Sequence, residues 1–265
     1  MSKKFPIALT VAGTDPTGGA GVLTDIKAFH SREVYGMSAV TSLTAQNTLG
    51  VQDVYNIPVD FLNAQLTSIF DDELPDAMKS GMIATADMME VIKGFVEKYR
   101  IPYVIDPVMI ATSGDNLIDD KAIDYLRDHL IQTALCITPN IIEAERLSGL
   151  SIKTEEDINR AAKIFINDLG VQSVIIKGGH LKGDAVDYLF TKEHVQRLSS
   201  ERIDTNHTHG TGCTFSAVIT AEIAKGKSLE SAFKTGKNYI TNAIKNTPGI
   251  GKGNGPVNHF SYKGE

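Results

Sequence analysis

"GTGCTFSAVITAEIAKG", residues 210–226, is the stretch that decides the fold. Gly210 and Gly212 allow a tight backbone turn because neither carries a Cβ, Thr211 is a candidate N-cap, and residues 213–225 have the small side chains of a packed helix. The N–H groups of such a loop converge at the positive end of the helix, where a phosphate or the charge that develops in phosphoryl transfer is stabilised. The stretch predicts an anion-binding loop, although a glycine-rich helix start that binds nothing fits the same residues.

A cysteine, Cys213, stands in the first turn of this predicted helix. A helix N-terminus can lower the pKa of a thiol from its usual value of about 8.5, so we expect a partly ionised thiolate near a substrate hydroxyl. Burial as a small hydrophobic residue is the commoner fate of a lone cysteine, and Cys136 in the apolar "ALCITP" segment fits that alternative. Neither cysteine belongs to a metal-binding pair or to a disulfide framework, which indicates a reducing compartment.

Length and composition are typical of one globular domain that covers residues 1–265. The formal net charge of -6 and the pI of about 5.7 argue against a broad surface for nucleic acid or an anionic membrane, because such surfaces need clustered Lys and Arg. No apolar run approaches the ~20 residues of a membrane helix, and the start "MSKKFPIALTVAG" lacks the pattern of a signal peptide. We therefore expect a cytoplasmic protein without nucleic-acid or membrane partners.

Short β-branched runs alternate with longer amphipathic segments along the whole chain. This alternation is typical of an α/β fold in which helices cover both faces of a largely parallel sheet. The predicted strands are 7–13, 37–47, 76–82, 103–109, 134–140, 173–179 and 187–190, and helices are predicted at 59–70 and 154–168. Polar or glycine-bearing turns follow most of these strands, so a ligand site is expected at the carboxyl edge of the sheet.

Candidate nucleotide groups follow two of the later strands, although neither a Walker loop nor a Rossmann glycine motif is present. In "TPNIIEAERL", Asn140 and Glu143 share one helical face and could hold a hydrated Mg²⁺ between carboxylate and phosphate oxygens. The local alternative is an Asn N-cap with acidic residues in the first turn. In "VIIKGGH", Lys177 ends a strand, where it could meet a phosphate or remain a solvated surface lysine.

Six motifs together carry a resemblance to a known family. In order they are "AGTDPTGGAG", "YGMSAVTSLTAQNTLGVQ", "DPVM", "TPNIIEAE", "KGGHL" and "THGTGCTFSA". From about residue 5 to residue 260 the chain resembles the hydroxymethylpyrimidine/phosphomethylpyrimidine kinases of thiamine biosynthesis. The resemblance implies a ribokinase-like fold and a homodimer. It also implies MgATP-dependent phosphorylation of 4-amino-5-hydroxymethyl-2-methylpyrimidine, and then of its monophosphate to the pyrophosphate.

The resemblance also implies roles for individual residues. Gln46 would bind the amino and ring-nitrogen edge of the pyrimidine, and its side-chain amide offers the donor and the acceptor that this edge needs. Its neighbours in the substrate pocket would be Gly13, Asp25, Met82 and Val108. The anion hole would be formed by Gly210, Thr211 and Gly212, with Cys213 beside the substrate hydroxyl. ATP would be bound by Asn140, Lys177, Gly178, Gly179 and Lys237, and Glu143 would bind the magnesium ion.

Two features keep other interpretations open. Thr112 stands where relatives often have a lysine in "VMxAKSGD", which removes a cation that could help to close the loop over phosphate. Pyridoxal kinases of the same subfamily share the glycine–cysteine loop, but their dual-cysteine type carries a second cysteine after "DPVM", and this chain has "IATSGD" there. Gln46 favours the aminopyrimidine as substrate. A non-catalytic pyrimidine sensor on the same fold is the third interpretation.

Overall fold

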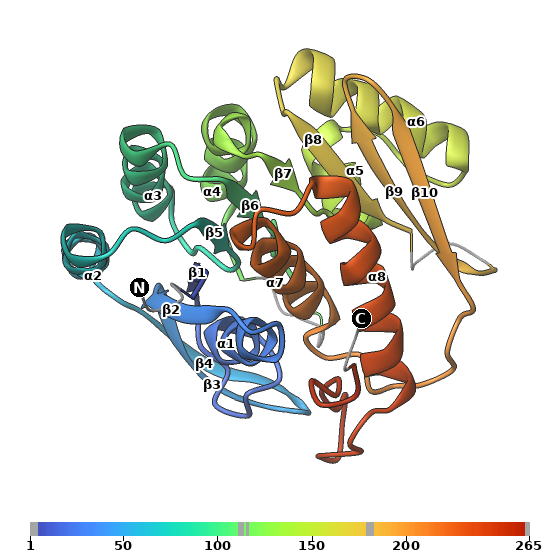
Figure 1. Cartoon of the computed structure of the whole chain (residues 1–265), viewed down its shortest axis with the longest axis horizontal. Helices are drawn as coiled ribbons and strands as arrows, with labels where there is room; N and C mark the ends of the chain where they lie inside the picture. Colours follow the sequence, from blue (N-terminus) through green and yellow to red (C-terminus); the bar gives the residue numbers. More distant parts are fainter. Residues whose placement is uncertain (1–4, 111–113, 115–116, 179–182, 263–265) are drawn as a thin grey trace.

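The structure, a computed structural model, describes residues 5–110, 114, 117–178 and 183–262. Its centre is a sheet with the strand order β10-β9-β8-β7-β6-β5-β1-β2 (Figure 1). Six neighbouring strands of this sheet, β2, β1, β5, β6, β7 and β8, run parallel. Strands β9 and β10 follow β8 at one side and pair antiparallel. Their bounds are β1 Ile7–Ala12, β2 Tyr35–Val40, β5 Ala77–Ser80, β6 Tyr103–Ile105, β7 Cys136–Ile137, β8 Ser173–Lys177, β9 Ala185–Thr191 and β10 Val195–Ser200.

Helices cover both faces of this sheet (Figure 1). They are α1 Gly21–Ser31, α2 Val59–Asp72, α3 Ala86–Tyr99, α4 Asp120–Tyr125, α5 Ile141–Ser148, α6 Glu155–Lys163, α7 Thr211–Ala224 and α8 Leu229–Lys245. Short π-helical segments, Leu126–Leu130 and Ile164–Asp168, extend α4 and α6, and a 3₁₀ turn spans Ile131–Thr133. The α/β class expected from the sequence, a mainly parallel central sheet with helices on both faces, is confirmed.

The sheet separates two hydrophobic cores. Successive strand residues point to opposite faces, so Leu9 and Val11 pack with α2 to α6, whereas Ala8 packs with α1, α7 and α8. Helix α7 lies between α1 and α8, and all of its residues from Thr214 to Ala224 are buried. Its small side chains allow this close packing on three sides, which fixes the start of α7 at the edge of the sheet.

The predicted strand 37–47 is in fact two strands. Strand β2 ends at Val40, the Thr41 hydroxyl donates to the Met82 carbonyl oxygen, and the chain then leaves the main sheet. Residues Ser42–Asn47 form β3, which pairs with β4 (Gly50–Asn56) as a separate two-stranded sheet. The pattern of 37–47 is continuous, so only the tertiary contact of Thr41 marks the break.

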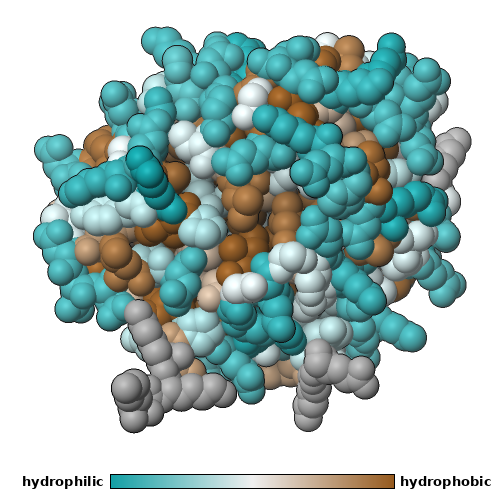
Figure 2. Space-filling model, turned by 45° about the horizontal axis from the view of Figure 1, so that its top comes forward, coloured by the Kyte–Doolittle hydropathy of each residue, from teal (hydrophilic) through white to brown (hydrophobic). Residues whose placement is uncertain are grey.

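Other differences are smaller. Strands β4 and β10 were not predicted, because each exposes one or both faces and lacks a continuous apolar run. The predicted helix at 154–168 is divided between α6 and the π-helical segment. Within the described ranges, no helix is both long and apolar enough to cross a membrane. Most of the face seen in Figure 2 is hydrophilic, with smaller hydrophobic areas between the polar side chains.

Candidate active site

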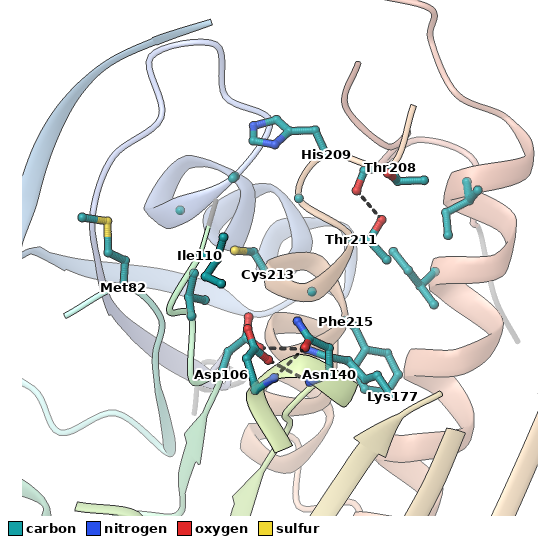
Figure 3. A pocket seen from close by; sticks show the side chains of 18 of the residues that line it. Met82, Asp106, Ile110, Asn140, Lys177, Thr208, His209, Thr211, Cys213 and Phe215 are labelled. Carbon is teal, nitrogen blue, oxygen red and sulfur yellow. Dashed lines mark hydrogen bonds and ion pairs between the residues drawn. The ribbon is translucent and has the colours of Figure 1, made fainter. Parts of the chain in front are cut away.

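The loops at the carboxyl edge of the parallel strands enclose a cavity of about 650 Å³. It extends from the β3 hairpin and the loop after β1, past the start of α7, to the ends of β7 and β8 and to one side of α8. Figure 3 shows Cys213 in the middle, with Met82 and His209 on one side of it and Asn140, Lys177 and Phe215 on the other. The start of α7 therefore divides the cavity into two halves.

The glycine loop before α7 has the geometry of an anion site, with one change from the prediction. Gly210 is the N-cap residue at φ 75°, and a Cβ there would lie 1.7 Å from the Gly19 carbonyl oxygen, so only glycine fits. Thr211 is not the cap: it is the first helical residue, and its hydroxyl and amide both donate to the Thr208 carbonyl oxygen. The amides of Gly212 and Cys213 lie in the first turn, where a helix offers them no acceptor.

The thiol of Cys213 differs from the expected thiolate. Burial raises the pKa of Cys213 to about 12, and the negative charges of Asp106 and Asp25 add to that increase. The positive charge of Lys79 and a hydrogen bond from the Gly21 amide oppose it without compensating for it. The expectation of a partly ionised thiol is wrong, because the helix N-terminus is outweighed by burial and by the surrounding carboxylates.

An acidic residue that the sequence reasoning missed lies next to the loop. Asp106 follows β6 in the "DPVM" motif and is 1% exposed. Its Oδ1 atom accepts from Lys177 Nζ at 3.0 Å and from Thr138 Oγ1 at 3.2 Å, whereas Oδ2 is buried and has no hydrogen-bond partner among the described residues. A Cβ on Gly212 would lie 3.5 Å from that Oδ2 atom, so the open carboxylate oxygen faces the first turn of α7.

Asn140 and Glu143 form a reciprocal cap at the start of α5. The Glu143 amide donates to Asn140 Oδ1 at 2.9 Å, and the Asn140 amide donates to Glu143 Oε2 at 2.7 Å. The local alternative is therefore present, and both residues also line the cavity. Burial raises the pKa of Glu143 to about 7; the charge of Asp106 adds to the rise, whereas Lys177 opposes it.

Lys177 is the cation of this cluster. Burial by itself would lower the pKa of Lys177, but the charges of Asp106 and Glu143 outweigh it and raise that pKa above its ordinary value. The lysine therefore stays charged at the base of the cavity. A phosphate at the Gly212 and Cys213 amides would lie beside a partly buried cation and an open carboxylate oxygen.

Comparison with known proteins identifies this arrangement. The family described as phosphomethylpyrimidine kinase matches residues 15–258. The chain belongs to the phosphomethylpyrimidine kinase family. It is 57% identical over 262 residues to the hydroxymethylpyrimidine/phosphomethylpyrimidine kinase of Staphylococcus aureus (strain MRSA252), covering 98% of this chain and 95% of that protein.

Two solved structures are similar over most of the chain. One is the ADP complex of Bacillus subtilis pyridoxal kinase, with a TM-score of 0.89 and 41% identity, covering 97% of this chain and 98% of that one. The other is the phosphomethylpyrimidine kinase of Clostridium difficile 630, with a TM-score of 0.81 and 38% identity, covering 91% and 100%. The family expected from the sequence is confirmed.

Most of the residues that the resemblance implied for this kinase family are brought together around the cavity. Gly13, Gln46, Met82, Val108, Asn140, Glu143, Lys177, Gly210, Thr211, Gly212, Cys213 and Lys237 line it. Lys237 reaches it from α8, where its Nζ donates to Asp187 Oδ2 at 2.8 Å and to the Ala185 carbonyl oxygen at 2.7 Å. Gly179 and Thr112 lie outside the described residues.

Two residues assigned by the family resemblance do not line the cavity. Asp25 is fully buried below it, where its carboxylate accepts from Lys79 Nζ at 2.8 Å and from Thr10 Oγ1 at 2.6 Å. The assignment of Asp25 as a pocket neighbour is therefore corrected: it forms an ion pair beneath the site. Gly178 is buried beside the cavity and does not line it, and its amide donates to Asp187 Oδ1 at 3.0 Å.

A second missed pair lies on the Gln46 side of this kinase cavity. His209 lies in the loop before the glycine motif, but its ring is buried and its Nε2 lies 2.7 Å from Asp15 Oδ2. Hydrogen bonds from His209 and Thr17 outweigh the effect of burial and hold the pKa of Asp15 below its ordinary value. The only local signal for these residues was their position, Asp15 after a buried strand and His209 before the glycine loop.

Proposed function

We propose that this member of the phosphomethylpyrimidine kinase family transfers the γ-phosphoryl group of ATP to the hydroxymethyl group of 4-amino-5-hydroxymethyl-2-methylpyrimidine, and then phosphorylates the monophosphate to the pyrophosphate. One observation carries the proposal. The amides of Gly212 and Cys213 lie in one cavity between the half that holds Gln46 and the half that holds Asn140 and Lys177. Such amides can stabilise the negative charge of the phosphoryl group as it passes from ATP to the pyrimidine.

The substrate half fits a small flat ring. Gln46 supplies a side-chain amide, which offers one acceptor and one donor to an aminopyrimidine edge. A Cβ on Gly13 would lie only 3.2 Å from Met82 Sδ, so glycine allows the Met82 side chain to pack closely on the backbone at this side of the cavity. A planar heteroaromatic ring is the ligand that such a slot accommodates best.

The nucleotide half combines charged and apolar groups. Lys177 lies near the start of α7, whereas Lys237, Ile240 and Ile244 line the cavity from α8. This arrangement suits a ligand with phosphates at one end and an apolar base at the other. The ADP complex of the B. subtilis relative supports ATP as the phosphoryl donor.

The carboxylates present fit a magnesium ion that is held partly by phosphate. In the described part of the chain, no cluster of three or more His, Cys, Asp or Glu side chains could hold a metal by itself. Mg²⁺ at kinase sites is usually bound through one or two carboxylates, waters and the phosphates. Asp106, whose buried Oδ2 has no partner in the part of the chain that the structure describes, and Glu143 would supply the carboxylates. When bound, the ion neutralises charge on the transferred phosphoryl group.

The residues of this chain act mainly by positioning and by charge stabilisation. In the first step the substrate oxygen bonds to the γ-phosphorus, the bond to the leaving ADP oxygen breaks, and the hydroxyl proton passes to an oxygen of the transferred phosphoryl group. Because burial raises the pKa of Cys213 to about 12, its thiol is a neutral neighbour of that hydroxyl and not a strong base. A largely dissociative transition state makes little demand on a base. In the second step a phosphate oxygen attacks, and no alcohol is deprotonated.

Pyridoxal is the second candidate substrate. The observation that favours it is the similarity to the B. subtilis pyridoxal kinase structure, at 41% identity. The chain is more similar to the S. aureus pyrimidine kinase, at 57% identity, and it has no cysteine in the "IATSGD" stretch after "DPVM". The pyrimidine is therefore the proposed substrate.

A coupled assay of ADP formation tests this choice. Purified protein is supplied with MgATP and, in turn, hydroxymethylpyrimidine, its monophosphate and pyridoxal. We expect turnover with both pyrimidines and a higher kcat/KM for hydroxymethylpyrimidine than for pyridoxal. A much higher kcat/KM for pyridoxal would overturn the substrate assignment. Pyrimidine binding without any ATP turnover would instead identify a sensor.

We also propose that the enzyme is a cytoplasmic homodimer. Cys136 and Cys213 are unpaired thiols, as in proteins of reducing compartments. The β3–β4 hairpin and the nearby β2 expose large apolar side chains, among them Leu49 (66%), Tyr55 (63%) and Tyr35 (63%). A second copy of the chain could cover such a surface. Light scattering during size exclusion is expected to give twice the monomer mass, and a monomer mass would contradict the proposal.

A further inference from the structure

The pyrimidine half of the cavity is bounded by a hairpin that lies outside the main sheet. Strands β3 and β4 form a separate two-stranded sheet, and Thr44 and Gln46 of β3 line the cavity. The base of the hairpin is tied to the loop after β1, because the Thr44 hydroxyl donates to the Thr14 carbonyl oxygen at 2.8 Å. The turn that joins the two strands lies beside the C-terminal segment, drawn in red in Figure 1. Turn and segment meet at Thr48.

Thr48 accepts hydrogen bonds from three successive amides of this segment. The Lys252 and Gly253 amides donate to Thr48 Oγ1 at 3.1 and 3.2 Å. The Asn254 amide donates to the Thr48 carbonyl oxygen at 2.9 Å. The two backbones approach so closely that a Cβ on Gly253 would lie 2.1 Å from that carbonyl oxygen. Any side chain at position 253 would therefore push the turn and the segment apart.

The same segment is bound to the loop that leads into α7. The Gly255 amide donates to His207 Nδ1 at 3.1 Å, and the Gly255 carbonyl oxygen accepts from the His209 amide at 3.1 Å. A Cβ on Gly255 would lie 2.2 Å from His207 Nδ1, so this contact is also a close one. Gly210, the N-cap of α7, follows His209 directly. Residues 252–255, the C-terminal strap, therefore connect the tip of the hairpin with the anion loop.

The C-terminal strap is fixed to the packed helices and not only to the hairpin. The chain that follows it is tied to the end of α8, because the Asn258 amide donates to the Ala243 carbonyl oxygen at 3.0 Å. The Thr247 hydroxyl, just after α8, donates to the Pro256 carbonyl oxygen at 3.2 Å. Helix α8 in turn packs on α7. The strap thus belongs to the α7–α8 unit, against which the separate hairpin is held.

We propose that the C-terminal strap, acting through Thr48, is a positioning device that holds the β3–β4 hairpin closed on the pyrimidine half of the cavity. The proposal rests on the proposed kinase activity. A ring in this half must keep its hydroxyl at the amides of Gly212 and Cys213, and a small displacement of the reacting groups costs much of the rate. The strap binds both the hairpin and the loop before α7, so it fixes the distance between them. Thr48 does not line the cavity and acts on the substrate only through the hairpin.

This role predicts an effect on one substrate and not on the other. If the hairpin opens, only part of the protein is competent to bind the pyrimidine, and the apparent affinity falls by that fraction. The nucleotide half is lined by α8 and the ends of β7 and β8, on the other side of the start of α7. Loosening the hairpin should therefore raise KM for the pyrimidine and leave KM for ATP unchanged. A general loss of folded protein would change neither KM.

Substitutions on both sides of the contact test the proposal in the coupled assay. Gly253→Ala, which separates the backbones, is expected to raise KM for hydroxymethylpyrimidine about tenfold, with a smaller change in kcat. Thr48→Val removes the acceptor of two amides and should raise that KM about threefold, whereas Thr48→Ser keeps the hydroxyl and should stay within about 1.5-fold of the wild type. Lys252→Ala, which removes an exposed side chain and keeps the amide, is the matched control.

The double variant Thr48→Val/Gly253→Ala should be no worse than Gly253→Ala alone, because both substitutions break the same contact. The Thr48 variants change one surface turn, so they keep the test valid if Gly253→Ala does not fold. A wild-type pyrimidine KM in Thr48→Val, an equal rise in Thr48→Ser, or a parallel rise of KM for ATP would overturn the positioning role.

Hydrogen exchange followed by mass spectrometry tests the contact without any turnover. In Thr48→Val and Gly253→Ala, the amides of residues 252–254 and of the β3–β4 turn should exchange faster than in the wild type, whereas Lys252→Ala should match it. Unchanged exchange in both variants would overturn the positioning role. Faster exchange together with a wild-type protein that does not turn over hydroxymethylpyrimidine would instead overturn the proposed function and leave the strap in place.

Discussion

The buried ion pair beneath the cavity allows a quantitative prediction. Lys79 and Asp25 are both fully buried, their Nζ and Oδ1 atoms lie 2.8 Å apart, and Thr10 Oγ1 supplies the second hydrogen bond to the carboxylate. In Lys79→Met the side chain keeps its approximate volume, but Asp25 loses its cation. A buried charge without a partner is costly, whereas the intact pair itself contributes little to stability.

We expect Lys79→Met to lower the free energy of unfolding by a large amount for a single substitution. Removal of one partner from a buried pair costs about 3–5 kcal/mol. In a chain of this size each kcal/mol lowers Tm by about 2–4 °C, so Lys79→Met should unfold about 6–20 °C below the wild type. The double variant Lys79→Met/Asp25→Asn should recover most of this loss, because it leaves no uncompensated charge and keeps an acceptor for Thr10. Lys93→Met, which breaks the exposed pair with Glu97, should cost about 0.3–0.5 kcal/mol.

The pH dependence adds an independent test. Burial raises the pKa of Asp25 even with Lys79 present, and loss of the lysine should raise it further. A carboxyl whose folded pKa lies above its unfolded value destabilises the fold as pH rises above the unfolded value. The deficit of Lys79→Met should thus be smaller at pH 5 than at pH 8. Urea unfolding followed by circular dichroism at pH 5 and pH 8 measures the free energy of unfolding and its pH dependence. If Lys79→Met loses no more free energy of unfolding than Lys93→Met, the reasoning is refuted.

Three further predictions concern the active site. Gly212→Val should lower kcat about 10²- to 10³-fold with little change in pyrimidine KM, because its side chain would enter the space near Lys177 Nζ, 3.3 Å from the Cβ position; unchanged turnover would remove the anion-hole assignment. Asp106→Asn should raise the Mg²⁺ concentration needed for half-maximal turnover, and identical magnesium curves would contradict its role. Cys213 should react with iodoacetamide about 10²-fold more slowly at pH 8 than a free thiol, because burial raises its pKa to about 12 and the greater nucleophilicity of such a thiolate offsets only part of the loss. A rapid reaction would refute that pKa.

Much of the fold is predictable because its main signals are local. The alternation of apolar runs and amphipathic segments identifies the parallel sheet, and the small residues of α7 indicate a helix packed on several sides. The Asn140 cap is likewise contained in one short motif. The departure of the chain at Thr41 depends on the Met82 carbonyl oxygen, 41 residues away, and no periodicity within 37–47 could reveal it.

The positions of site residues are more predictable than their partners. Strand ends converge at one edge of a parallel sheet, so the sequence could place Asn140 and Lys177 near one another. The pairs Lys79–Asp25 and His209–Asp15 join residues 54 and 194 positions apart, and they decide which carboxylates are already occupied. Neither pairing shows in a local pattern, so the family resemblance placed Asp25 in the pocket, and nothing in the sequence predicted that His209 is buried against Asp15.

The pairing of charges also determines how much positive charge the cavity can offer to the phosphates of ATP. Both lysines that line the cavity in the described part of the chain are already matched, Lys177 by Asp106 and Lys237 by Asp187. The triphosphate of ATP brings several negative charges into a cavity whose lysines already have acidic partners; Arg146 and Arg202 are further cations in its described lining. The two amides of the glycine loop supply only partial charges. A divalent cation at the open side of Asp106 would provide further positive charge, and this is the electrostatic argument for our proposal that magnesium accompanies the nucleotide.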